Sequence, residues 1–138
     1  MSLYDVLLFA HVFGAFSLIA GTTAMAPFAL GIGAAAFERA EAARVAAVGA
    51  VMSGIGAVLT IGIGSWLVAN RGYHLLRLWL LGAYVLWGIA GFSNGQVSTA
   101  ARRFGNDDGG PPDVKRFWYA DAIAAGLILV LMIWKPGH

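Results

Sequence analysis

One histidine, His11, lies inside a long apolar stretch near the start of the sequence. From Val6 to Phe37 there is no Asp, Glu, Lys or Arg, and His11 is the only readily titratable side chain in that interval. About 20 apolar residues suffice to cross the hydrocarbon core of a bilayer, so the stretch predicts a membrane-spanning helix. An ionisable side chain inside a membrane is costly and by default indicates a functional site. His11 is therefore the first residue to which we assign chemistry.

His11 shares one face of the predicted helix with several small residues. The residues at alternating three- and four-residue steps are Tyr4, Leu7, His11, Gly14, Leu18 and Gly21. Small residues let backbones or flat ligands approach a membrane helix closely, so we expect this face to point into a helix bundle. Gly14, one turn from His11, would leave room for a planar group such as a haem. The alternative is a histidine that only hydrogen-bonds a neighbouring helix.

The composition predicts a membrane protein throughout. Of the 138 residues, 59% are hydrophobic and only 12% are charged, whereas about 25% of residues are charged in typical soluble domains. The basic residues are scattered at loop ends, which is typical of helix orientation in a membrane, so we expect no nucleic-acid role. The chain has no cysteine, which excludes disulfides and a covalently attached c-type haem. Any haem would have to be non-covalent.

The apolar segments predict one all-α domain over residues 1–138, a four-transmembrane-helix bundle. The expected spans cover about residues 4–33, 45–70, 75–101 and 117–134. Two small-residue patterns predict close helix contacts: the four-residue spacing of Gly56, Thr60 and Gly64, and the GxxxG pair Gly91 and Gly95.

Two polar residues, Asn94 and Asp121, fall at comparable depth in the third and fourth spans. They could hydrogen-bond each other or form a polar pocket. The preferred interpretation is a simpler one, in which Asp121 lies near a helix N-terminus, is favoured by the helix dipole and is reached by water.

The basic residues also predict an orientation. Six lie on the first and third connections and three on the other side: Arg39, Arg44, Arg102, Arg103, Lys115 and Arg116 against Arg71, Arg77 and Lys135. The positive-inside rule puts the six in the cytoplasm and both termini outside. A haem on His11 could then direct its propionates toward Arg71, Arg77 or Lys135.

The second axial ligand stays open at this stage. Candidates are His74 after a local shift, a non-histidine group, water, or a second subunit. Copper is a competing use of histidines on the outer side, but the sequence offers few soft ligands there, with Met132 as one isolated thioether.

Two short motifs carry a resemblance to known membrane proteins. The opening LLFAHVFGAFSLIAG resembles the L-x-x-H-V-x-G-A first helix of a group of uncharacterised bacterial four-helix membrane proteins, and LMIWKPGH resembles their Lys-Pro ending. That group is distantly similar to HemJ-type protoporphyrinogen oxidases and CopD-type membrane domains. The resemblance implies haem b binding by the first-helix histidine, which maps here onto His11. No lysine lies inside a middle span, which departs from the HemJ-type pattern, so the resemblance implies a haem-associated or redox-associated membrane protein and leaves its activity open.

We therefore expect a multi-pass protein of a bacterial inner membrane that binds haem b at His11. Its expected role is electron transfer or a haem-linked oxidation, and the expected cofactor-binding residues are His11, Gly14, His74, Arg77 and Lys135, with His11 as the metal ligand. The alternatives are a cofactor-free accessory or structural subunit of a membrane complex, and a small copper or solute transport module. Besides the lipid bilayer, the expected partner is a second copy or a larger membrane complex, because four spans bury little around a large cofactor.

Overall fold

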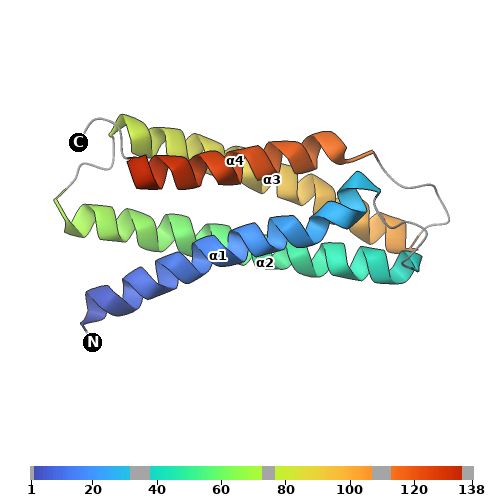
Figure 1. The fold of residues 1–138 in the computed structure, drawn as a ribbon, viewed down its shortest axis with the longest axis horizontal. Coiled ribbons are helices and arrows are strands. Elements are labelled where there is room, and N and C mark those ends of the chain that lie inside the picture. The colour runs from blue at the N-terminus through green and yellow to red at the C-terminus, as the bar shows by residue number, and fades with distance from the viewer. Residues whose placement is uncertain (1, 32–37, 73–76, 107–112, 135–138) are drawn as a thin grey trace.

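The computed structural model describes residues 2–31, 38–72, 77–106 and 113–134. They form four α-helices: α1 (Leu3–Leu30), α2 (Arg39–Asn70), α3 (Leu78–Asn106) and α4 (Lys115–Trp134). The helices lie alongside one another in an elongated bundle in which α1 pairs with α2 and α3 pairs with α4 (Figure 1). The start of α1 and the end of α4 lie at the same end, which we call the terminal end. The predicted all-α class and four-helix bundle are confirmed.

Local signals fix both ends of α1. Ser2 and Asp5 form a capping box: the Ser2 hydroxyl accepts from the Asp5 backbone N–H at 3.2 Å, and the Asp5 carboxylate accepts from the Ser2 N–H at 2.9 Å. Pro27 lies within the last turn, and the helix continues to Leu30. Gly31 ends it with a positive φ of 66°, a conformation that glycine adopts without steric cost.

Glycines hold α1 and α2 in close contact. A Cβ placed on Gly21 would collide with backbone atoms of Ser53 and Gly49, and one on Gly56 would collide with the backbone of Leu18 and Gly14. Backbones approach this closely in membrane helix pairs when small residues line the contact. The predicted contact role of Gly56 is confirmed. The GxxxG pair of α3 differs, because a Cβ on Gly91 or Gly95 would meet nothing within 4 Å in this chain.

The interior is layered along the bundle axis. One apolar cluster contains Leu18, Ala57 and Ala125 with Trp87 packed against it. A second cluster, nearer the end opposite the termini, contains Met25, Ala29, Ala50, Val97 and Val114. On each of the four helices, buried polar side chains lie between the residues of these two clusters. They are Thr22, Ser53, Ser93, Asn94 and Asp121.

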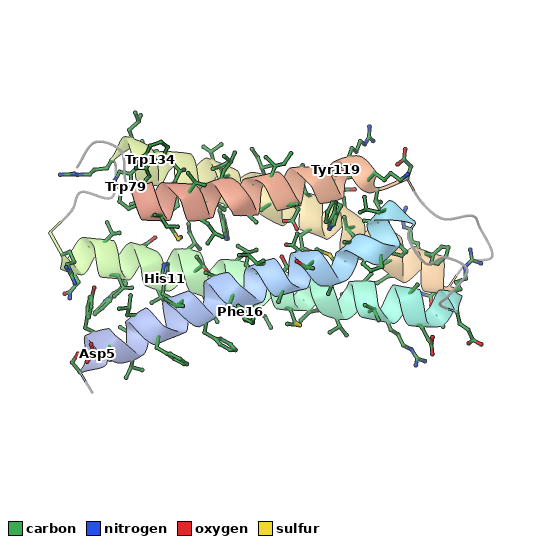
Figure 2. The ribbon with its side chains drawn as sticks, in the orientation of Figure 1. Asp5, His11, Phe16, Trp79, Tyr119 and Trp134 are labelled. Atoms are coloured by element: carbon green, nitrogen blue, oxygen red, sulfur yellow. The ribbon has the colours of Figure 1, made fainter. Side chains whose placement is uncertain are left out.

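Three helices, α1, α2 and α4, are long and apolar enough to cross a membrane. Many large apolar side chains on the bundle surface are exposed, as expected for contact with lipid; Figure 2 shows Phe16, which is 69% exposed, projecting away from the bundle. Helix α3 is not among the three, although it was predicted as a span. Its second half carries Ser93, Asn94, Gln96, Ser98 and Thr99, which lower its mean hydropathy.

Candidate functional site

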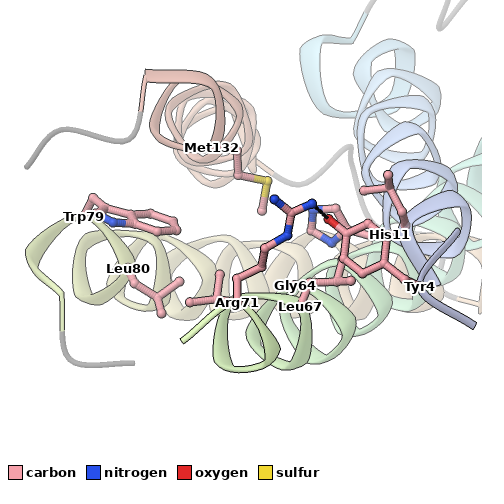
Figure 3. Close-up of a pocket in the computed structure, with 10 residues that line it drawn as sticks. Tyr4, His11, Gly64, Leu67, Arg71, Trp79, Leu80 and Met132 are labelled. Carbon is pink, nitrogen blue, oxygen red and sulfur yellow. Dashed lines mark hydrogen bonds between the residues drawn. The ribbon is translucent and has the colours of Figure 1, made fainter. Parts of the chain in front are cut away.

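A pocket of about 270 Å³ lies at the terminal end of the bundle, and every helix contributes to its wall (Figure 3). The lining residues are Tyr4, Leu8 and His11 from α1, Gly64, Leu67, Val68 and Arg71 at the end of α2, Trp79 and Leu80 from α3, and Met132 from α4. The wall is mainly apolar, with a few polar groups that converge on the same space. This combination is typical of small-molecule and cofactor sites.

The ring of His11 lies against the backbone of α2. A Cβ on Gly64 would lie 2.7 Å from His11 Cε1 and 3.1 Å from Nδ1, so the ring occupies space that only a glycine leaves open. His11 is half-buried and lies where α1 faces α2 (Figure 2). The small-residue pattern on α2 therefore has a second role, since its last glycine sets the position of the imidazole.

A cation stands beside the same pocket. The Arg71 guanidinium donates a hydrogen bond from Nη2 to the Tyr4 hydroxyl at 2.7 Å, and its carbon lies 4.9 Å from the centroid of the Tyr4 ring. Arg71 is exposed and directly follows α2, so it is hydrated while its planar head is held in place. An acidic group of a ligand in the pocket would meet this guanidinium.

Two further groups of the wall were not predicted as site residues. The Met132 side chain brings a soft thioether sulfur to the pocket. Trp79 is 7% exposed, and its buried indole N–H has no hydrogen-bond partner among the described residues. A buried donor is costly to leave unsatisfied, so the Trp79 N–H calls for a partner that the described residues do not supply.

The other predicted cofactor-binding residues are placed differently. The space beside Gly14 is filled by α2, because a Cβ there would lie 2.8 Å from Leu59 Cβ and 3.0 Å from Thr60 Oγ1. Gly14 therefore packs helices and leaves no room for a planar group at its own position. Arg77 precedes α3, where its carbonyl accepts from the backbone of Leu80 and Leu81, and it is not one of the lining residues. His74 and Lys135 lie outside the described residues.

Asp121 and Asn94 do not hydrogen-bond each other. The Asp121 carboxyl oxygen Oδ2 accepts from the Thr22 hydroxyl at 2.8 Å, and the Asn94 amide donates to the Ala50 carbonyl at 3.1 Å. Asp121 has no exposed surface, so the predicted access of water to this carboxyl is wrong for the packed bundle. Helix α1 covers Asp121 through Thr22, a contact that residue spacing within α4 does not reveal.

Comparisons with known proteins do not assign the chain to a family. No family model, no curated protein sequence and no solved structure matches the chain. Within the described ranges, no three His, Cys, Asp or Glu side chains are grouped so as to hold a metal ion. The fold and the pocket together define a four-helix bundle with three helices suited to a membrane and a ligand-sized pocket at one end.

Proposed function

We propose that this protein is a membrane haem b protein with a role in electron transfer or a haem-linked oxidation, and that His11 is the iron ligand. The observation that carries the proposal is the placement of the His11 imidazole and the Met132 thioether in the wall of one pocket, beside Arg71. Histidine and methionine are the axial ligand pair of some cytochromes.

The lining residues suit the chemistry of a haem, but the pocket is small for a group of that size. The imidazole suits iron, the guanidinium suits a propionate, and the apolar wall suits the macrocycle. A volume of about 270 Å³ lies just below the range of about 300–1,000 Å³ typical of pockets for drug-sized ligands. A haem would therefore extend beyond the pocket or separate the helices that line it.

When bound, the haem would supply one-electron redox chemistry. The residues of this chain would do the rest: His11 would hold the iron, Gly64 would keep the imidazole in place, and Arg71 would neutralise an acidic substituent. The apolar wall from Leu8, Leu67 and Leu80 would limit the access of water.

We also propose a location and an assembly. The distribution of basic residues supports a bacterial inner membrane protein with both termini outside, which would place the pocket in the outer half of the bilayer. A homodimer or larger complex would cover a haem that extends beyond a small pocket.

Optical spectra of the detergent-purified protein test the proposal. We expect a Soret band that sharpens on reduction with dithionite in the wild type and is lost in His11→Ala. Gly64→Val should also weaken it, because the new side chain would displace the imidazole. Gly62→Val is the matched control, since a Cβ at Gly62 meets nothing within 4 Å. A colourless wild type from haem-replete cells would rule the proposal out.

A second candidate, a cofactor-free accessory subunit, is favoured by the contact of His11 with Gly64. That contact gives the ring a packing role without any ligand. In this case His11→Phe should keep the fold and the assembly of the protein, and no haem should co-purify. A copper transport module would use the same imidazole and thioether, and uptake of Cu(I) that depends on both residues would distinguish it.

A further inference from the structure

Asp121 is fully buried inside the bundle and belongs to a hydrogen-bonded group from three helices. Thr22 Oγ1 of α1 donates to Asp121 Oδ2 at 2.8 Å and lies 3.3 Å from Ser53 Oγ of α2. None of the three is more than 5% exposed. The two hydroxyls and the carboxyl form one continuous chain of polar groups.

The direction of the hydrogen bonds follows from the chemistry of the groups. Because the Thr22 hydroxyl proton is given to Asp121, Ser53 is the donor to Thr22. Asp121 Oδ2 is thus satisfied, whereas the buried Oδ1 has no partner among the described residues. One atom of the carboxyl still requires a proton or a donor.

Apolar layers separate this group from both ends of the bundle. Leu18, Ala57 and Ala125 lie on the side of the terminal end, and Met25, Ala50 and Val97 lie on the other side. Among the described residues, the group that hydrogen-bonds the Asp121 carboxyl is the Thr22 hydroxyl, and no ion pair to Asp121 occurs there. The nearest cationic side chains along α4, Lys115 and Arg116, are exposed at its start.

Charge is costly in such surroundings. In an apolar layer, an ionised carboxylate with a single hydrogen bond and no counter-ion among the described residues is far more costly than the neutral acid. A proton also requires no cavity, unlike a metal ion. We propose that Asp121, Thr22 and Ser53 form a proton-binding site in the membrane interior, with the proton on Asp121 Oδ1 in the packed bundle.

The site is distinct from the His11 pocket and does not depend on haem. His11 and Thr22 are 11 residues apart on α1, which is about 16 Å along the helix. Two hydrogen bonds join α4 to Thr22: the one to Asp121 and another from Trp118 Nε1 to the Thr22 carbonyl at 2.9 Å.

Infrared spectroscopy of the reconstituted protein at neutral pH tests the proposal. We expect a carbonyl stretching band of a protonated carboxylic acid, shifted in D2O, that is absent in Asp121→Asn. The band should persist in Asp113→Asn, which alters an exposed carboxyl. In Thr22→Val it should move to higher frequency, because the carbonyl oxygen loses its hydrogen bond. A wild type without this band overturns the proposal.

Carbodiimide labelling assigns the proton even if Asp121→Asn fails to fold. A membrane-permeant carbodiimide takes up the carboxyl proton on nitrogen while the carboxyl oxygen bonds to its central carbon, and rearrangement to the N-acylurea retains all atoms. Trypsin cleavage after Arg116 gives residues 117–138, in which Asp121 is the only side-chain carboxyl. The mass of one carbodiimide, located on Asp121 by fragmentation of this peptide after labelling at neutral pH, supports the proposal, and label confined to other residues contradicts it.

Discussion

At the scale of single residues, the chemistry of the bundle centres on two ionisable side chains whose surroundings are completed by neighbouring helices. His11 and Asp121 stand out because ionisable side chains are rare in apolar helices. Their partners Gly64 and Thr22 are 53 and 99 positions away from them in the chain. Such contacts depend on how four helices are rotated about their axes, and the spacing of residues within one helix does not identify which residue of a neighbouring helix a side chain meets.

Two adjacent threonines allow the contribution of the buried group to be measured. Thr22 is 5% exposed, and its hydroxyl donates a hydrogen bond to Asp121. Thr23 is exposed, and its hydroxyl donates to the backbone carbonyl of Ile19 on the same helix. We expect Thr22→Val to lower the free energy of unfolding by about 1–2 kcal/mol, because Asp121 loses its one donor. Thr23→Val should change it by less than about 0.5 kcal/mol. Unfolding in mixed micelles, followed by circular dichroism, measures both, and equal effects would contradict the assignment.

At the scale of helices, the small-residue patterns were only partly informative. The spacing of Gly56, Thr60 and Gly64 correctly indicated a contact face, because this face of α2 meets α1. The same kind of pattern at Gly91 and Gly95 faces open space within this chain. A glycine pair allows close approach, but it does not determine whether another helix is present.

Alanine substitution of a glycine at the contact between α1 and α2 tests how closely these two helices pack. In Gly21→Ala the added methyl group would collide with the backbone of Ser53 and Gly49, so α1 and α2 must separate. We expect a loss of about 1–3 kcal/mol or more in the free energy of unfolding. Gly126→Ala is the control, because its methyl group meets nothing within 4 Å; it should be neutral or stabilising by up to about 1 kcal/mol. Unfolding in mixed micelles compares the two variants, and a neutral effect of Gly21→Ala would show that α1 and α2 are not in close contact at Gly21.

At the scale of the whole molecule, the apolar segments predicted the helix number and class because four long segments are separated by charged or turn-rich stretches. The bounds differ most where α2 begins at Arg39 and α3 continues to Asn106, since charged residues extend helices beyond an apolar core. The main difference concerns α3. This helix packs along the bundle, but it is more polar than α1, α2 and α4 and is not among the helices that are apolar enough to cross a membrane. Its buried Ser93 and Asn94 face protein, and a helix shielded in this way can cross a bilayer with polar groups inside.

The topology can be tested with single cysteines, because the natural chain has none and is its own unlabelled control. Exposed positions at three helix ends are suitable: Glu41, Asn70 and Asp113. If α2 and α3 both cross the membrane with the basic connections inside, a membrane-impermeant maleimide should label Asn70→Cys in intact cells. Glu41→Cys and Asp113→Cys should then be labelled only after the cells are made permeable. Labelling of Asn70→Cys and Asp113→Cys from the same side would show that α3 lies against the other helices without crossing the bilayer.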